Sequence, residues 1–503
     1  MIRILLTSDI HGYIFPHSYA DNRTYRVGMA AVSTLISKLK DENTILIDNG
    51  DILEGSPLCY YHYHFHPKQI SPFAYAMNHI GYDFYNLGNH DFDHGQNRLM
   101  EHIASLKMPC ITSNVSYKGK QLSKDYHILN VDNKKIALFG LTTQYIPNWE
   151  EKEKISDLSF TDALDKAKAT VKIIQEKEHP DYIICAYHGG LERDPLTHEL
   201  TEKDTGENEG YMICKEIPEI NILLCGHQHH PMKGKLFNTV FVQNDSNGTQ
   251  ISCVAIDTIN NTITPELIFV DEEADEKLLE PLMEEEKQCQ NWLDEPLGTC
   301  KINLRVEDDF EARLHKSQVI TFLNKVFMEI SGADLSSNSL FLNAKGFNSQ
   351  ITMRDLVSTY VFPNTLVVKK INGKVLREYL EQNALFWDHH DGKIIIEKSH
   401  DFPTPQHFNY DLIDGVEYQI KVSNPVGQKI TRLNRNGQPV KDDDEFTICI
   451  SNYRSAGGGG FEMLKDAETV KEIQRNVVEL LAEYIANKKV IDFEPITNID
   501  VVI

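Results

Sequence analysis

The chain has 503 residues, of which 41% are hydrophobic and 25% are charged, a composition typical of globular proteins with roughly two to four domains. Lys and Arg number 50 and Asp and Glu number 74, so the formal net charge is −24. This charge repels a phosphate backbone and excludes non-specific binding to long DNA or RNA, but a bound metal can still admit a small anionic substrate.

The hydrophobic runs, the first residues and the cysteines indicate the cellular compartment of the protein. No run of about 18 apolar residues occurs, so no transmembrane helix and no membrane contact are predicted. The first residues, MIRILLTSDIHG, hold too few apolar residues for a signal peptide. The nine cysteines include no C-x-x-C pair, which favours reduced, mostly buried thiols. We expect a cytoplasmic protein, or an exported one if a leader has been removed.

The first half of the chain alternates short apolar runs with helical patterns. The predicted strands are residues 2–6, 44–47, 82–87, 136–141, 182–186 and 220–224. Amphipathic helices are predicted over residues 28–40 and 160–177, and strand-like alternation continues over 239–270. Strands that alternate with helices predict a layered α/β domain, which we place at residues 1–270.

Residues 271–300 differ from their surroundings, since they hold eleven acidic residues against two lysines. We interpret them as a solvated, mostly helical linker; the alternative is a surface helix of one domain. A second domain is predicted at 301–503, with helices over 317–330 and 374–383 and strands over 366–371, 418–422 and 446–450. The sequence predicts no oligomeric state.

Polar clusters follow the apolar runs of the first domain directly. They are Asp9-Ile10-His11, Asn49-Gly50-Asp51, Gly88-Asn89-His90-Asp91-Phe92-Asp93, His188-Gly189-Gly190 and Gly226-His227-Gln228-His229. Ligands of open α/β sheets bind beyond the carboxyl ends of the strands, so we expect these groups to converge on one rim.

The residue types in these clusters indicate a metal site. Carboxylate, amide and imidazole ligands without thiolate favour Mn, Fe, Zn or Mg over a structural zinc. The set exceeds the needs of one ion and suits two ions, about 3.5–4 Å apart, that share a carboxylate. Each of the five polar clusters alone is weak evidence for a metal site, whereas the five together are strong evidence for one. The His-rich run 60–66 (YYHYHFH) lacks a strand before it, so we expect an aromatic loop or strand there and no metal site.

Longer motifs resemble a known family. DNGDILEGSPL (48–58), NLGNHDFDHG (86–95), YVFPNTLVV (360–368) and SNYRSAGGGGF (451–461) resemble the two-domain 5′-nucleotidase and 2′,3′-cyclic-nucleotide 2′-phosphodiesterase (3′-nucleotidase) family of calcineurin-like metallophosphoesterases. The resemblance implies an N-terminal four-layer α/β/β/α metallophosphoesterase domain and a C-terminal α+β nucleotide-binding domain. It also implies that the two domains close over the substrate, with a hinge near the linker.

The resemblance assigns the metal ligands. It implies that Asp9, His11 and His229 hold one metal, that Asn89, His188 and His227 hold a second, and that Asp51 bridges them. His229 is a departure, since relatives in the 5′-nucleotidase branch often have Gln there. We expect two divalent ions and favour manganese for both, with Zn, Fe, Co or Mg as alternatives.

The resemblance also assigns catalysis to His90 and Asp93. An imidazolium at His90 would stabilise charge on the phosphoryl group, and Asp93 would orient the ring and raise its pKa. The alternative for His90 is a residue that only supports Asn89. We expect direct in-line attack of a metal-bound hydroxide, without a phospho-enzyme.

The second domain should hold the nucleoside. Family members stack the base between two aromatic rings, which here correspond to Phe362 and Tyr453, and Asn364 is expected to contact the base or the sugar. Stacking tolerates any base, so broad base specificity is expected. The alternative for each ring is plain core packing.

The branch of the family follows from finer features. FLNAKGF (341–347) replaces the "GGGIR" common in 5′-nucleotidases, and NYDLIDGVEYQIKVS (409–423) resembles the cyclic phosphodiesterase branch. We therefore expect a 2′,3′-cyclic-nucleotide 2′-phosphodiesterase/3′-nucleotidase that acts on small nucleotides. The alternatives are a 5′-nucleotidase, a nucleotide-sugar hydrolase, or a nucleotide sensor without catalysis.

Overall fold

The computed structural model describes residues 1–20, 23–66, 71–201, 205–362, 364–401, 405–473 and 475–503. The chain forms two compact units, Met1–Cys289 (unit 1) and Gln290–Ile503 (unit 2). The division falls inside the predicted linker 271–300, whose borders stay a prediction. The described residues include no helix with the length and apolar character that a membrane crossing requires.

Unit 1 is built on two sheets. The first has the order β14-β13-β1-β2-β3, with β1 (Ile2–Thr7), β2 (Thr44–Asp48), β3 (Phe84–Tyr85), β13 (Gln250–Asp257) and β14 (Thr262–Phe269). The second has the order β11-β12-β10-β9-β7-β6, with β6 (His127–Val131), β7 (Lys134–Thr142), β9 (Tyr182–His188), β10 (Ile222–Cys225), β11 (Met232–Leu236) and β12 (Thr239–Gln243). The neighbours β1, β2 and β3 are parallel, and so are β7, β9, β10 and β12.

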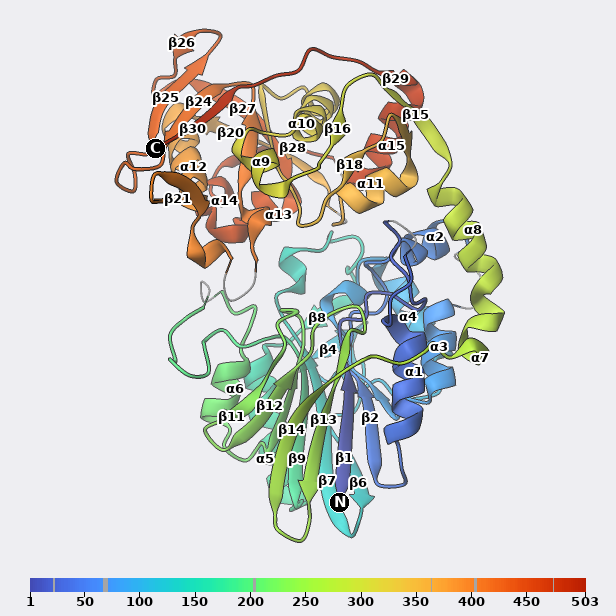
Figure 1. The fold of residues 1–503 in the computed structure, drawn as a ribbon. Coiled ribbons are helices and arrows are strands. Elements are labelled where there is room, and N and C mark those ends of the chain that lie inside the picture. The colour runs from blue at the N-terminus through green and yellow to red at the C-terminus, as the bar shows by residue number, and fades with distance from the viewer. Residues whose placement is uncertain (21–22, 67–70, 202–204, 363, 402–404, 474) are drawn as a thin grey trace. The chain divides into compact units, whose positions relative to one another are not determined.

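Side-chain alternation divides the core of unit 1 into layers. Ile4 of β1 and Ile184 of β9 share one buried cluster, which fills the space between the two sheets. The next residue of β9, Cys185, points to the other face and packs with Val171 of α5 (Ala163–Lys177) and Ile213 of α6 (Gly210–Glu216). Helices α1 (Gly28–Leu39) and α3 (Pro72–Ile80) lie together on the opposite side of the unit (Figure 1). This is the expected α/β/β/α arrangement.

The predicted elements of unit 1 differ from the structure in two places. The run 82–87 yields only the two-residue β3, and its end Asn86–Gly88 leaves the strand to form the rim. The His-rich run 60–66, expected as a loop or strand, lies mostly in α2 (Pro57–Phe65), so that expectation was wrong. The reason is local: Ser56 caps the helix by accepting the Cys59 N–H, and proline occupies the first helical position.

The acidic segment is less solvated than expected. It forms α7 (Glu276–Leu279) and α8 (Met283–Leu293). Glu286, only 5% exposed, accepts hydrogen bonds from His17 and Tyr19, and Glu285 lies 2.7 Å from His62 Nδ1. Histidines more than 200 residues away thus hold part of these acids against unit 1, a pairing that local composition cannot indicate.

Unit 2 combines helices with sheets in which most strand pairs are antiparallel, as the α+β expectation stated. Its main sheet has the order β23-β17-β27-β20-β28, with β17 (Leu335–Ser339), β20 (Leu366–Asn372), β23 (Asp411–Asp414), β27 (Glu445–Ser451) and β28 (Glu468–Ile473). The neighbours β17 and β27 of this sheet are parallel. Its longer helices are α10 (Gln318–Ser331), α12 (Gly373–Asn383) and α15 (Val477–Lys488), and the short α13 (Asn452–Ser455) follows β27 directly. Ser317 caps α10 and Gly332 ends it in the left-handed region, so the sequence sets both ends of that helix.

Candidate functional site

The predicted metal ligands come together at the carboxyl ends of the parallel strands of unit 1. Asp9 and His11 follow β1, Asp51 follows β2, His188 ends β9, and His227 and His229 follow β10. Asn89 begins the short helix η1 (Asn89–Asp91) after β3. The two sheets face each other across the core, so their strand ends form one rim, as expected.

One group of ligand atoms gathers around His11. Ligand atoms of Asp9, His11, Asp51 and His229 all lie within 4.8 Å of one another. The Nε2 atoms of His11 and His229 are 2.9 Å apart, and His229 Nε2 is 3.4 Å from Asp9 Oδ1. His11 donates its Nδ1–H to the carbonyl oxygen of Glu54 at 2.8 Å, which leaves Nε2 facing the group.

A second group gathers around His188. Ligand atoms of Asp51, His188 and His227 also lie within 4.8 Å of one another. His188 Nε2 is 3.1 Å from Asp51 Oδ2 and 3.2 Å from Asn89 Oδ1, and its Nδ1–H is donated to the Asn49 carbonyl at 2.5 Å. His227 Nδ1 lies 2.7 Å from Asn89 Oδ1. Asp51 belongs to both groups, as a bridging ligand would.

The residues present fit a divalent metal site. Asp51 Oδ2 is buried and receives no hydrogen bond of proper geometry, although His188 Nε2 lies near it. A buried carboxylate oxygen without a partner is costly, and so are two imidazole nitrogens that face each other at hydrogen-bond distance. A divalent cation would satisfy all of these lone pairs at once, and the oxygen and imidazole donors are ones such ions accept.

The protonation states of two of the predicted ligands, Asp9 and His11, suit metal binding. Burial raises the pKa of Asp9, but the charges of His188 and His229 outweigh it and lower the pKa to about 2. Burial, together with His229, lowers the pKa of His11 to about 4. Near neutral pH, Asp9 is therefore ionised and His11 is neutral, the forms that ligate a metal.

Five of the seven predicted ligands have a strained backbone conformation. Asp9, His11, Asp51, His227 and His229 have φ angles of 57°, 51°, 60°, 74° and 51°, all in the left-handed region. Residues other than glycine rarely adopt this backbone conformation, and those that do are concentrated at functional sites.

His90 and Asp93 form a pair beside the metal ligands. His90 Nδ1 lies 2.9 Å from Asp93 Oδ2, and the His90 ring is 5.4 Å from the His11 ring. Burial alone would lower the pKa of His90, but the charges of Asp93 and Asp51 raise it well above its usual value. The backbone N–H of His90 donates to Asp51 Oδ1 at 2.7 Å, so the pair is tied to the bridging carboxylate.

Two supporting acids were not predicted from the sequence. Asp91 accepts the backbone N–H groups of Ile52 and Leu53 on Oδ1 and those of Gly88 and Asp51 on Oδ2. It therefore joins the loops after β2 and β3, and its place in the GNHD motif was the available signal. Glu207, from a loop without any motif, lies with Oε1 2.8 Å from His227 Nε2.

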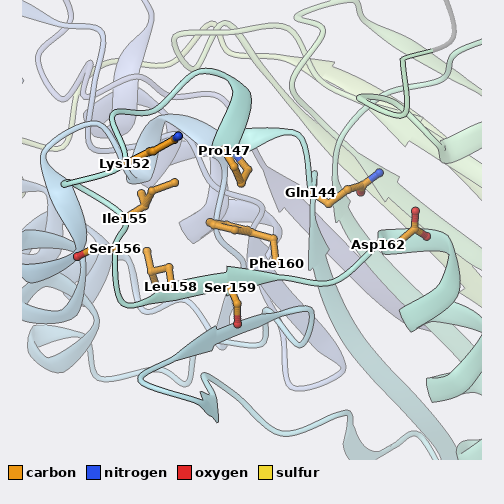
Figure 2. Close-up of a pocket in the computed structure, with 9 residues that line it drawn as sticks. All are labelled: Gln144, Pro147, Lys152, Ile155, Ser156, Leu158, Ser159, Phe160 and Asp162. Atoms are coloured by element: carbon orange, nitrogen blue, oxygen red, sulfur yellow. The ribbon is translucent and has the colours of Figure 1, made fainter. Parts of the chain in front are cut away.

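Unit 1 also has an open cavity of about 440 Å³ (Figure 2). Nine side chains between Gln144 and Asp162 line it, and Phe160, Ile155 and Pro147 give it an apolar wall. None of the metal ligands lines this cavity.

The predicted nucleoside residues lie at the surface of unit 2. Phe362 is 42% exposed and Tyr453 is 36% exposed, so neither ring is plain core. The Phe362 ring packs edge-on against Phe341, with centroids 5.0 Å apart, and lies 6.4 Å from the ring of Phe408. Asn364 donates its side-chain amide to Tyr360 Oη at 3.3 Å. An exposed aromatic cluster of this kind can stack on a base.

Arg454 ties the turn that carries Tyr453 to this cluster. Its guanidinium is 4% exposed and pairs with Asp411, with Nε–Oδ2 and Nη2–Oδ1 distances of 2.7 and 3.0 Å. It also donates to the carbonyl oxygens of Phe408 and Gly458. No local sequence pattern links Arg454, Asp411 and Phe408, so these three residues were not predicted.

Comparison with protein families finds two matches along the chain. Residues 2–231 match the calcineurin-like phosphoesterase family, and residues 297–466 match the 5′-nucleotidase C-terminal domain. Each match lies within one of the two compact units.

Individual relatives cover nearly the whole chain. A 2′,3′-cyclic-nucleotide 2′-phosphodiesterase/3′-nucleotidase of Salmonella typhimurium is 27% identical over 91% of this chain and 81% of its own length. A 5′-nucleotidase of Vibrio vulnificus is 23% identical over 94% and 89%, respectively. The crystal structure of a candidate 5′-nucleotidase from Staphylococcus aureus, in complex with α-ketoglutarate, is 32% identical, with a TM-score of 0.91 over 100% of this chain and 99% of that one.

Proposed function

Since this chain belongs to the two-domain 5′-nucleotidase family, with a calcineurin-like phosphoesterase domain and a 5′-nucleotidase C-terminal domain, we propose that it is a 2′,3′-cyclic-nucleotide 2′-phosphodiesterase/3′-nucleotidase. The family makes it a phosphoester hydrolase with nucleotide substrates. The narrower choice is supported by relatives that carry this name, such as that of Salmonella typhimurium, and by the NYRSAGG turn of this chain.

The observation that carries the proposal is the convergence of ligand atoms on Asp51. We assign Asp9, His11 and His229 to one divalent ion, Asn89, His188 and His227 to another, and Asp51 to both. We propose manganese for these positions, since oxygen and imidazole donors suit it. When bound, two such ions lower the pKa of water and neutralise charge on the phosphoryl oxygens.

The residues of the chain would then divide the remaining work. His90 is held by Asp93 in its protonated form, and it would donate a hydrogen bond to the phosphoryl group as negative charge develops there. The imidazole is 31% exposed, so it can reach a substrate that enters from solvent. No nucleophilic side chain is needed, because water is the attacking group.

Unit 2 would supply the recognition of the nucleoside. Phe362 and Tyr453 offer exposed ring faces for stacking, and Asn364 offers an amide for the base or sugar. Stacking on a base is worth about 1–3 kcal/mol and does not depend on which base is present. We therefore propose broad base specificity.

A second candidate function is 5′-nucleotidase activity. The 32% identical Staphylococcus aureus protein, a candidate 5′-nucleotidase, favours it. The metal site and His90 would serve both reactions, so the two functions differ only in which phosphoester is presented.

The test is one panel of initial rates with Mn²⁺-loaded protein on 2′,3′-cyclic AMP, 3′-AMP, 5′-AMP and a nucleotide sugar. We expect fast hydrolysis of the first two and slow hydrolysis of 5′-AMP. Dominant hydrolysis of 5′-AMP would replace the proposed specificity by the second candidate. Protein stripped of metal is the control, and activity that survives the stripping would contradict the metal-dependent mechanism.

A further inference from the structure

Three histidines of the rim, His11, His188 and His227, are not oriented alike. His11 and His188 turn Nε2 towards the ligand groups and donate Nδ1–H to a backbone carbonyl. His227 is reversed: its Nδ1 is 2.7 Å from Asn89 Oδ1, and its Nε2 is 2.8 Å from Glu207 Oε1. His227 is thus the one of the three that is backed by a carboxylate.

The partner at the far nitrogen decides which nitrogen is free to ligate. An ionised carboxylate can only accept hydrogen bonds, so Glu207 requires a proton on His227 Nε2. The lone pair of His227 then lies on Nδ1 and faces Asn89. A carboxylate behind a ligating histidine also raises the basicity of the ring, and loss of such a partner costs about 10–100-fold in metal affinity or activity.

Glu207 is held in place independently of His227. Its carbonyl oxygen accepts hydrogen bonds from Thr143 Oγ1 at 2.7 Å and from Tyr187 Oη at 3.3 Å. Thr143 follows β7 and Tyr187 precedes His188 in β9, so the two strands that frame the rim also fix the Glu207 backbone. The Trp149 ring covers His227, with centroids 5.6 Å apart and an angle of 32°.

We propose that Glu207 is a positioning residue that fixes His227 with Nδ1 towards Asn89, and that it thereby sets the metal affinity of the Asn89–His188–His227 subsite alone. This inference rests on the proposed function, because it concerns the metal site of that function. The His11–His229 subsite has no contact with Glu207 among the described residues and should keep its affinity.

The experiment is calorimetric titration of the full-length, metal-free chain with Mn²⁺. Glu207→Ala removes both orientation and charge, whereas Glu207→Gln keeps an oxygen that can accept from Nε2–H and removes only the charge. Glu199→Gln, an exposed acid of the neighbouring loop, is the matched control. Initial rates are measured on the same samples across a range of Mn²⁺ concentrations.

We expect two binding steps in the unchanged chain. Glu207→Ala should weaken the Mn²⁺ affinity of one step by about 10–100-fold and leave the other step unchanged. The affinity of Glu207→Gln for that step should lie between those of Glu207→Ala and the unchanged chain, and the control should match the unchanged chain. Excess Mn²⁺ should restore much of the rate, which a purely structural defect would not allow.

Two results would overturn the inference. The first is that the isotherms of both Glu207 variants overlay that of the unchanged chain, which would show that Glu207 does not set metal affinity. The second is that both Mn²⁺-binding steps weaken equally, which would show that its effect is not confined to one subsite. If the unchanged chain binds no metal, the proposed function fails as well. If it binds two ions and hydrolyses nucleotides while the Glu207 variants bind normally, only this inference fails.

Discussion

The buried pair between Arg454 and Asp411 offers a sharp test of how unit 2 holds its exposed aromatic rings. We consider Asp411→Asn, which keeps the shape of the side chain and removes its charge. Arg454 is 4% exposed and has two contacts to Asp411, so its charge would be left buried without a counter-charge. The carbonyl oxygens of Phe408 and Gly458 remain as partners, but they carry no net charge.

The expected cost follows from this burial. Removing one partner of a buried ion pair typically costs about 3–5 kcal/mol. An asparagine oxygen can still accept one of the two hydrogen bonds, so we expect the lower end, about 3 kcal/mol. At about 1.4 kcal/mol per tenfold change, the equilibrium for local opening around residues 446–461 should rise roughly 100-fold. The turn that carries Tyr453 would be less fixed, and KM for nucleotides should rise.

Hydrogen exchange of peptides from 446–461 measures the opening directly, and steady-state kinetics gives KM. The matched control is Glu445→Gln in the same unit, whose partner Lys370 lies 3.0 Å away in a pair that is 68% and 41% exposed, respectively. An exposed pair contributes about 0–1 kcal/mol, so exchange should change less than about fivefold. If Asp411→Asn and Glu445→Gln accelerate exchange equally, or if neither does, the pair does not anchor the turn.

Three further predictions concern the two sites. His90→Asn should lower kcat about 10²–10⁴-fold, while the metal content measured by elemental analysis stays the same. Loss of metal in this variant would instead indicate that His90 only supports Asn89. Phe362→Ala and Tyr453→Ala should each raise KM for nucleotides about tenfold and leave hydrolysis of p-nitrophenyl phosphate, which has no base, unchanged; an equal rise for both substrates would contradict a nucleoside role. Burial raises the pKa of Asp48 to about 7, so its contribution to stability is fully present below about pH 4 and is lost as the pH rises through 7. The free energy of unfolding of the metal-free chain, measured with urea, should therefore fall over this pH range by up to about 4 kcal/mol. Asp48→Asn should reduce this dependence on pH, and an equal dependence in both proteins would refute the role of Asp48.

Much of the fold could be predicted because its signals are local. Apolar runs marked the sheets, and Ser317 with Gly332 delimits α10. The errors arose where a distant contact or an overlooked cap decides the outcome. The run 60–66 is helical because Ser56 and Pro57 start a helix before it, and the acids of α8 are held by histidines far away in the sequence.

The grouping of the predicted ligands at one rim could be foreseen from the sequence, and the residues that support them could not. Asp9, Asp51 and His188 stand at strand ends, where topology alone brings them together. Glu207 and Asp411 make side-chain contacts from a loop and a strand that share no motif with their partners. Such contacts depend on tertiary placement, so sequence patterns cannot report them.

The four buried aspartates at the strand ends show how the site separates ligands from supports. Asp9 and Asp51 face histidines, whose charges outweigh burial and lower both pKa values, so both carboxylates are ionised towards the rim. Burial raises the pKa of Asp48 to about 7 and that of Asp91 to about 6, while backbone N–H groups tie these two to the loops. Neighbouring carboxyl groups with pKa values pushed apart indicate different roles. Divalent ions at the rim would be held by both carboxylates in the folded chain and not in the unfolded chain, so metal binding should stabilise unit 1 as well as complete its chemistry.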